Sequence, residues 1–396
     1  MTQIDGAAHT GHTGTPRRDE EERRAREHWL GVAEPGDGTA HTLIDALGAA
    51  RARDLVASDV SAAVIVSELL EHTDAGADAV HEVVELVAHG LNRWRPRIGT
   101  IDSDAYRRAA ERCGARFIMP GDRDWPSGVD DLGENAPLGL WARGSLDVLP
   151  TRSVAVVGSR NSTGYGEHVT MEIASGLVAR GVGIISGAAY GIDGHAHRAT
   201  LASGGATAAF LAGGIDRPYP RGHSDLIERI ATEGVLLSEV PCGSTPTRWR
   251  FLQRNRLISA LATATIIVEA GWRSGSLNTA AHASTLGRPL GAVPGPVTSA
   301  ASAGCHRLLR ENDAVCVTSA DEAAELAGDS DDTDILSPLR DWIETRVLDA
   351  LSSRRPRTVD EIASRSGLDH DAVRSRLGTL SVLGDVRETS NGWLMA

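Results

Sequence analysis

The sequence predicts an α/β fold in which a Rossmann-like parallel sheet domain lies between a small helical N-terminal domain and a C-terminal winged-helix domain. Three observations predict it. Short β-branched runs alternate with longer helical runs from Arg152 onward, residues 27–88 show short helical segments, and the last segment reads as three helices and a ribbon. Repeated strand–loop–helix units are typical of a parallel sheet with helices on both faces.

The predicted strands are the apolar runs of this alternating region. They are VAVVGS, VGIISG, ATAAFLAGG, GVLLSEV, ATIIVEA, PLGAVPG and AVCV, and helical runs such as GEHVTMEIASGLVARG lie between them. In open parallel sheets, ligands bind beyond the carboxyl ends of the strands. We therefore expect the functional site in the loops that follow these strands.

Five segments are expected along the chain. They are a disordered polar tail (1–26), a small helical domain (27–112), the Rossmann-like domain with an N-terminal extension that holds a short strand at LGLWARG (113–327), an acidic linker (328–338) and a winged helix-turn-helix domain (339–396). The tail has no apolar core, so we expect it not to be a signal sequence. The winged helix is indicated by helical patterns at 339–351, 359–366 and 370–383 with a turn at Gly367.

All 40 basic residues are arginines, which excludes two large enzyme classes. Without lysine, the chain can form neither a Walker A phosphate site nor a Schiff base to pyridoxal phosphate. The four cysteines lie far apart with no metal-ligand spacing, so we expect no zinc, no disulfides and a cytoplasmic location. No apolar run approaches the length of about 18 residues that a membrane span needs.

The net charge of −13 is unevenly distributed along the chain. Residues 151–330 are neutral, with 15 arginines and 15 carboxylates, and residues 240–268 contain four arginines and no acid. A local basic groove on an acidic protein is therefore feasible, although a broad basic face is not.

The segment PTRWRFLQRNR (246–256) is the most informative loop, because it places four guanidinium groups around two aromatic rings. Arginine binds phosphates, and aromatic or guanidinium planes stack on any base. Arg254 and Arg256 have no acidic residue near them in the sequence, which favours a nucleic-acid contact over a solvated helix start. For Trp249 a buried position and a contact with a base are equally consistent with the pattern.

Three glycine-rich loops offer backbone N–H groups and hydroxyls to an anion at helix starts. The residues that we single out in them are Ser159 and Arg160 in the first, Gly187, Ala188 and Gly191 in the second, and Ser274, Gly275 and Ser276 in the third. Asp193 fits a helix N-cap better than a catalytic acid. His195 and His197 are two residues apart on a predicted helix, so we expect no metal site there.

Together these loops resemble the DNA-processing protein A family (DprA, also called Smf). The resemblance covers residues 115–317 and rests on VAVVGSRNSTGYG, IISGAAYGIDGHAH, LAGGIDRPYP, SEVPCGSTPTRWRFLQRNRLISALA, TIIVEAGWRSGSLNTAAHA and GRPLGAVPGPVTSAASAGCHRLL. The combination of FxxRNRxI with SGSLxTA is its specific part. His223 and Cys305-His306 depart from the family pattern, and the pocket lysines common in relatives are absent.

The resemblance implies a non-enzymatic protein that binds single-stranded DNA without sequence preference and loads RecA onto it in natural transformation or DNA recombination. It also implies a homodimer through the Rossmann-like domain, and neither a cofactor nor a metal. Carried over position by position, the DNA-binding residues would be Ser159, Arg160, Gly187, Ala188, Gly191, Phe251, Arg254, Asn255, Arg256, Ser274, Gly275 and Ser276.

Two other functions remain open. A Rossmann-like protein of the lysine-decarboxylase-like (LOG) type would bind a nucleotide or hydrolyse its N-glycosidic bond, but the glutamate of that family's PGGxGTxxE loop has no counterpart in RSGSLNTAAH. A regulator that binds duplex DNA would depend on the winged helix, whose third helix offers only Arg374 and Arg376 beside Asp369 and Asp371.

Overall fold

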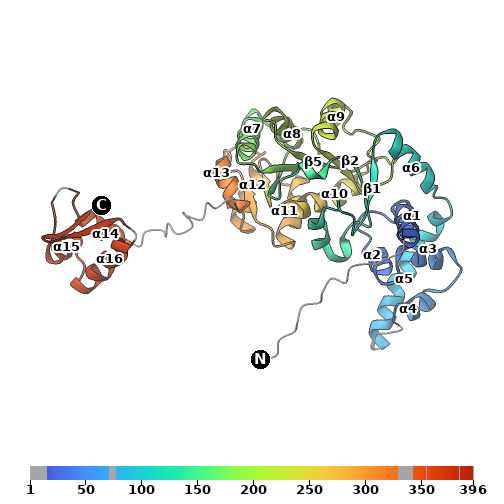
Figure 1. The fold of residues 1–396 in the computed structure, drawn as a ribbon, viewed down its shortest axis with the longest axis horizontal. Helices are drawn as coiled ribbons and strands as arrows, with labels where there is room; N and C mark the ends of the chain where they lie inside the picture. Colours follow the sequence, from blue (N-terminus) through green and yellow to red (C-terminus); the bar gives the residue numbers. More distant parts are fainter. Residues whose placement is uncertain (1–15, 71–76, 329–341, 354, 383, 396) are drawn as a thin grey trace. The chain divides into compact units, whose positions relative to one another are not determined.

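The protein consists of two compact units, Met1–Asp329 and Ser330–Ala396. The computed structural model describes residues 16–70, 77–328, 342–353, 355–382 and 384–395 (Figure 1). The predicted linker, apart from Gly328, and residues 1–15 of the predicted tail lie outside the described residues.

A nine-stranded sheet forms the centre of the first unit, in the order β1-β2-β6-β5-β4-β3-β7-β8-β9. Its strands are β1 (Arg116–Ile118), β2 (Leu140–Gly144), β3 (Ser153–Val157), β4 (Gly183–Ser186), β5 (Thr207–Leu211), β6 (Val235–Ser238), β7 (Ala264–Ile267), β8 (Leu290–Ala292) and β9 (Val315–Cys316). Strands β3 to β9 pair with one another in parallel, which confirms the predicted sheet. The predicted strand at LGLWARG is β2, which joins β1 and β6 in antiparallel pairing.

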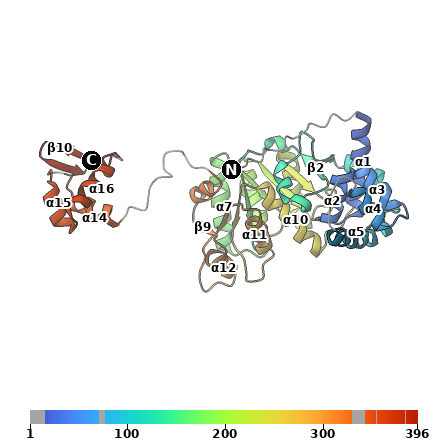
Figure 2. The same ribbon diagram turned by 90° about the horizontal axis from the view of Figure 1, so that it is seen from below.

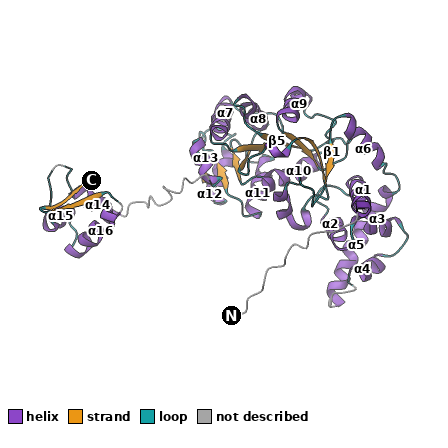
Figure 3. Ribbon diagram, in the orientation of Figure 1, coloured by secondary structure: helices purple, strands orange, loops and turns teal. Residues whose placement is uncertain are grey.

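Helices cover both faces of this sheet (Figures 2 and 3). Along β3 the side chains alternate, as a pleated strand requires. Val154 and Val156 pack with one set of helices, and Ala155 and Val157 pack with the other set. The first set is α7 (Gly164–Ala179), α8 (Ile192–Ala202) and α13 (Ala320–Leu326), and the second is α10 (Arg248–Leu261), α11 (Ser276–Thr285) and α12 (Ala303–Glu311). Helix α9 (Ser224–Glu233) lies near β5 and β6.

The N-terminal helices begin earlier than the sequence predicted. They are α1 (Pro16–Val32), α2 (Gly38–Leu47), α3 (Ala49–Ala57), α4 (Ala62–Leu69), α5 (Ala77–Ile98) and α6 (Ser103–Arg112). The prediction of a disordered tail up to residue 26 is wrong for residues 16–26, which are helical. The Glu22 carboxylate accepts hydrogen bonds from the N–H groups of Ala49 (2.8 Å) and Ala50 (3.4 Å) at the start of α3, and Ala25 is buried, so this charged run has a packed face.

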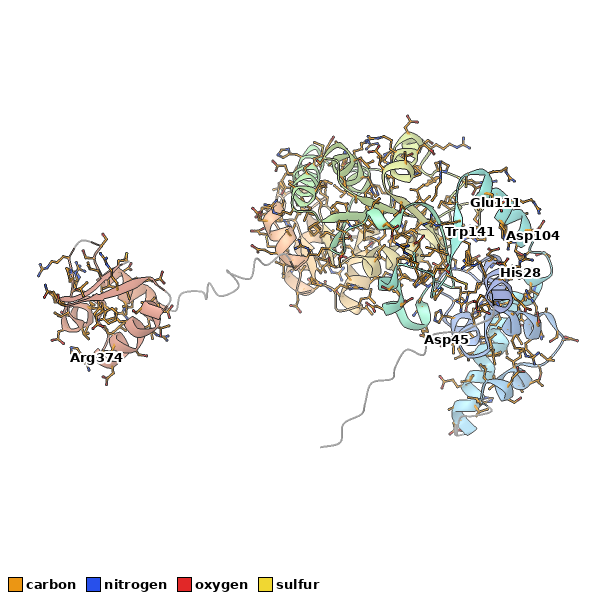
Figure 4. The ribbon with its side chains drawn as sticks, in the orientation of Figure 1. His28, Asp45, Asp104, Glu111, Trp141 and Arg374 are labelled. Atoms are coloured by element: carbon orange, nitrogen blue, oxygen red, sulfur yellow. The ribbon has the colours of Figure 1, made fainter. Side chains whose placement is uncertain are left out.

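The predicted domain boundary near residue 112 implied that these helices pack as a separate domain, and they do not. One continuous apolar cluster contains Trp29 of α1, Trp94 of α5, Trp141 of β2 and Leu236 of β6 (Trp141 is labelled in Figure 4). The rings of Trp29 and Trp94 meet edge to face, 5.4 Å apart. The helical region therefore shares its core with one edge of the sheet.

The second unit has the predicted winged-helix outline. It contains α14 (Trp342–Ala350), α15 (Val359–Ser366), α16 (His370–Val382) and the ribbon β10 (Val386–Thr389) and β11 (Gly392–Met395). A capping box of Thr358 and Glu361 starts α15, and Gly367 ends it with a left-handed φ of 66°. Val373 and Leu377 of α16 are fully buried in the core of this unit.

Candidate nucleic-acid interface

The loops that follow β3, β4, β5, β6 and β7 lie at one edge of the sheet, because these strands are parallel. We call these loops, the first turn of each helix that follows them and the second turn of α10 the strand-end rim. Direct contacts join its parts. The Ser159 carbonyl accepts a hydrogen bond from Ile192 N–H (3.1 Å), and the Asn255 side-chain amide donates to the Gly275 carbonyl (3.3 Å). The loops singled out in the sequence therefore form one continuous surface.

Phe251 lies between two arginines on this rim. The guanidinium carbon of Arg160 is 4.5 Å from the centre of its ring, and that of Arg254 is 5.9 Å away. Arg160 is exposed, whereas Arg254 is 5% exposed and donates from Nη1 to the Phe210 carbonyl (2.8 Å). Neither arginine forms an ion pair within the part of the chain that the structure describes. The result is a positive site beside an aromatic ring.

Arg254 carries a charge that the protein only partly compensates. Burial lowers the pKa of Arg254 to about 10, the nearby Asp193 carboxylate opposes this, and the charge of Arg160 lowers the pKa further. Arg254 is therefore still protonated at neutral pH, and its buried Nε has no hydrogen-bond partner among the described residues. An anion bound beside Arg160 would offset the repulsion between the two guanidinium groups.

The loop after β4 packs directly on Arg254 and requires glycine at two positions. A Cβ on Gly187 would overlap the Arg254 guanidinium, and a Cβ on Gly191 would overlap the Ser159 carbonyl. Gly191 also has a φ of 72°, which side-chain-bearing residues rarely adopt. These two glycines bring the β3 and β4 loops and α10 into contact.

Buried side chains fix the conformation of this loop. Ala188, at a φ of 53°, donates its N–H to His197 Nε2 (3.3 Å), and its carbonyl bonds His223 Nδ1 (3.1 Å). Gly187 N–H donates to the Asp193 carboxylate (3.2 Å). The N–H groups of Gly187 and Ala188, which we expected to bind an anion, are thus hydrogen-bonded within the protein.

The expectation that Asp193 caps α8 is wrong. Gly191 occupies the N-cap position, and Asp193 lies in the first helical turn, 5% exposed, with its carboxylate directed back to Gly187. Burial raises the pKa of Asp193, while the charge of Arg254 opposes that rise. The carboxylate has a positioning role in the loop, which a sequence pattern cannot separate from capping.

The His197 contacts predict a loss of stability in mild acid. Nδ1 bonds the Thr207 hydroxyl (2.7 Å), which itself donates to the Ile184 carbonyl, so Nδ1 carries the proton and Nε2 accepts. Burial lowers the pKa of His197 from 6.5 to about 3. Below about pH 6.5 the unfolded chain protonates His197 and the folded chain does not, which favours unfolding. The free energy of unfolding is therefore unaffected by His197 above about pH 6.5 and falls as the pH drops toward about 3.

Between about pH 7.5 and about pH 5.5, His197 alone should lower the free energy of unfolding by about 1.4 kcal/mol. Urea unfolding at the two pH values measures this change. His197→Gln should show a smaller pH dependence, whereas the exposed His168→Gln should match the parent protein. An equal pH dependence in all three proteins would contradict the assignment.

Two of the four arginines in segment 246–256 are paired with carboxylates, contrary to the expectation of four available guanidinium groups. Arg256 is 2% exposed and donates to both Glu239 oxygens (2.8 and 2.7 Å). Arg250 donates to both oxygens of Glu34 (3.0 and 3.1 Å). These acids come from outside the segment, so sequence proximity did not reveal them. Arg256 has a structural role, and its contact with DNA stays a prediction.

A third carboxylate occupies the start of α7. Glu269, which follows β7, accepts hydrogen bonds from the N–H (2.9 Å) and the hydroxyl (2.6 Å) of Thr163, the N-cap residue of α7. Nucleotide-binding Rossmann folds place a phosphate at such a helix start. Here the protein's own carboxylate takes that place, which disfavours the LOG-like alternative.

The serines of the rim bond within their own loops. Ser159 Oγ donates to the Asn161 carbonyl (3.0 Å), and the hydroxyls of Ser274 and Ser276 share a hydrogen bond (2.7 Å). Gly275 is exposed at the N-cap position of α11. Hydroxyls can exchange partners, so a role for these residues in ligand binding stays a prediction.

The rim carries several exposed arginines, of which the sequence had singled out only Arg160 and Arg248. Within the described residues, the exposed rim arginines without an ion pair are Arg160, Arg217, Arg221, Arg248 and Arg273. They come from the loops after β3 and β7, the connection between β5 and α9, and the first residue of α10. Elsewhere, some exposed arginines pair with carboxylates, as Arg51 does (2.7 Å to Glu68), and others, such as Arg123 and Arg198, have no ion pair among the described residues. The sequence could not show this difference, because the pairing partners are distant along the chain.

Three further features of the described residues bear on cysteine reactivity, metal binding and membrane crossing. All four cysteines are free, and burial raises the pKa of Cys242 and Cys305 to about 12, so these thiols stay protonated. The described residues contain no group of three or more His, Cys, Asp or Glu side chains placed to hold a metal. Nor does any described helix combine the length and apolarity that crossing a membrane requires.

Comparison with known proteins matches both units to one family. A family model described as DNA recombination-mediator protein A matches residues 116–328, and the DprA winged helix domain matches residues 323–392. A putative DNA processing protein DprA of Mycobacterium tuberculosis is 50% identical over 292 residues, covering 69% of this chain and 75% of that protein. Protein Smf of Escherichia coli is 34% identical over 268 residues, 65% of this chain and 71% of that protein.

A solved structure supports the same assignment. DNA processing protein A from Streptococcus pneumoniae superposes with a TM-score of 0.59 and 28% identity, covering 77% of this chain and 97% of that chain. The matched family model spans the sheet and all the loops of the strand-end rim. The chain belongs to the DprA/Smf family of DNA-processing proteins.

Proposed function

We propose that this protein binds single-stranded DNA at the strand-end rim, without sequence preference and without chemical turnover. The observation that carries the proposal is the set of exposed rim arginines without carboxylate partners, around Phe251 and the buried Arg254. Exposed arginines without ion pairs also lie elsewhere in this chain of net charge −13, but at the rim several of them gather at one sheet edge around an aromatic ring, where phosphates can bind. Membership of a DNA-processing family supports the same ligand.

The rim suits a flexible strand better than a rigid duplex. Its cations come from separate loops, and its central contact is an aromatic ring that can stack on any base. Base edges of a duplex are reached through the major groove by an inserted helix or ribbon, whereas the rim presents mainly loops. Single strands can expose both phosphates and base faces to such a surface.

Replacing Arg160 tests this assignment. We expect Arg160→Ala to weaken binding of oligonucleotides of any sequence by about tenfold or more, since it removes a charged hydrogen-bond donor. The slope of log affinity against log salt should become shallower by about 0.7 for each lost phosphate contact. Fluorescence anisotropy with labelled single strands at several salt concentrations measures both quantities.

Arg123→Ala is the matched control, because Arg123 is exposed, lies outside the rim and has no ion pair among the described residues. This variant should bind as the parent protein does. If both variants bind equally well, the rim is not the DNA site.

Loading of RecA and formation of a homodimer complete the proposal, and both rest on family kinship. The dimer would join two rims and raise the effective concentration of the second site on a long strand. Light scattering of the purified protein measures the oligomeric state. RecA-catalysed strand exchange on strands precoated with a single-strand-binding protein tests loading, and no acceleration by this protein would contradict that part of the proposal.

A further inference from the structure

Exposed aromatic side chains are concentrated on the strand-end rim to a degree that phosphate binding alone does not explain. Among the aromatic residues whose side chains the structure describes, five are between 41% and 56% exposed. They are Tyr165, Tyr190, Tyr219, Trp249 and Trp272. Each lies in the loop, or in the first helical turn, that follows a different parallel strand among β3 to β7. Exposed apolar side chains that are scattered singly are normal, whereas several gathered on one surface mark a binding site.

Most of these rings are held in place. The Tyr165 hydroxyl donates to the Pro294 carbonyl (2.6 Å), and the Tyr190 hydroxyl accepts from Gly222 N–H (3.3 Å). The Tyr219 ring packs 5.6 Å from that of Phe251. A ring that is fixed before binding loses little conformational entropy when a ligand stacks on it.

Unpaired arginines accompany these rings. Trp249 follows Arg248 directly and Trp272 precedes Arg273, and both arginines are exposed without an ion pair among the described residues. Arg307, which is paired with Glu311 (3.1 Å), lies 5.3 Å from the centre of the Trp272 ring. A polynucleotide supplies one phosphate with each base, so it matches a surface on which arginines and aromatic rings lie next to one another.

We infer that these five aromatics form a row, here called the stacking row, that binds successive bases on both sides of the Phe251 site. This inference rests on the proposed function. Four strand spacings separate β6 from β7 in the sheet, a distance of about 19 Å. A stacked strand rises about 3.4 Å per nucleotide, so the row has room for up to about six nucleotides. The ligand is thus a run of unpaired bases rather than a phosphate backbone alone.

An abasic strand separates base stacking from phosphate binding. We compare an oligothymidine of about 20 nucleotides with an abasic strand of equal length and charge. The stacking row predicts that the oligothymidine binds at least tenfold more tightly. Equal affinity for both strands would overturn the row, while the proposed phosphate contacts at Arg160 would survive. If the protein binds neither the oligothymidine nor the abasic strand, the proposed function itself is contradicted.

Single substitutions then locate the row. Trp249→Ala and Trp272→Ala should each weaken oligothymidine binding by about fivefold or more, the loss of one stacked base, and leave binding of the abasic strand unchanged. Trp249→Phe should retain most of the affinity. Leu86→Ala, which alters an exposed side chain of α5 away from the rim, is the control.

Tryptophan fluorescence gives an independent signal. Stacking should quench the emission of the parent protein when oligothymidine is added, and each Trp→Ala variant should lose part of that quenching. Full quenching and full affinity in both variants would overturn the row. Variants that bind oligothymidine normally but fail to self-associate would assign these aromatics to a protein interface instead.

Discussion

Replacing Arg256 by alanine is expected to lower the free energy of unfolding by about 3–5 kcal/mol. Its guanidinium also donates to the carbonyls of Asn135 (2.9 Å) and Gln253 (2.9 Å), so nearly all its donors are used inside the protein. The variant leaves the Glu239 carboxylate buried at 7% exposure without its partner. Urea unfolding followed by circular dichroism measures the loss.

A double variant separates this structural role from a direct contact with DNA. In Arg256→Met/Glu239→Leu no charge is left buried and unpaired, so much of the lost stability should return. If the variant is stable and binds single strands as the parent does, Arg256 acts on the fold alone. A stable double variant with weak binding would instead support the predicted DNA contact of Arg256.

Gly187→Ala should reduce single-strand binding by at least about tenfold and stability by about 1–3 kcal/mol. The added methyl group would overlap the Arg254 guanidinium, so either the arginine or the loop must move. Movement of either one changes the distance between Arg254 and Phe251, which is the central pair of the rim. Anisotropy titration and urea unfolding of the same sample measure the two effects.

Gly99→Ala is the matched control for this substitution. A Cβ at Gly99 meets no atom within 4 Å, and Gly99 lies outside the rim. This variant should bind and unfold as the parent protein does. Normal binding by Gly187→Ala would show that the packing of the β4 loop on Arg254 is not needed for the site.

The sheet and the winged helix were predictable because their signals are local. The apolar runs of β3 to β8 alternate with helical runs, and in the second unit Gly367 marks a turn that the structure forms with a left-handed backbone. The start of α1 was missed for the opposite reason. Its residues are charged, and only contacts with α3, such as that of Glu22, show that they are ordered.

The sequence predicted which loops form the candidate site, but not which of its arginines are free of carboxylate partners. Parallel strands necessarily bring Ser159, Gly187 and Gly275 to one edge. Whether an arginine on that edge is available depends on acids such as Glu34 and Glu239, which come from other elements. For the same reason, the availability of Arg217 and Arg273 could be recognised only after folding.

The central claim is that unpaired arginines at the strand ends bind a flexible polynucleotide. Titration of the purified protein with single-stranded and duplex oligonucleotides of equal length, at about 50 and about 200 mM salt, tests it most directly. We expect tighter binding of the single strand, and an affinity that falls as salt rises. Equal or tighter binding of the duplex, or single-strand affinity that does not change with salt, would contradict the account.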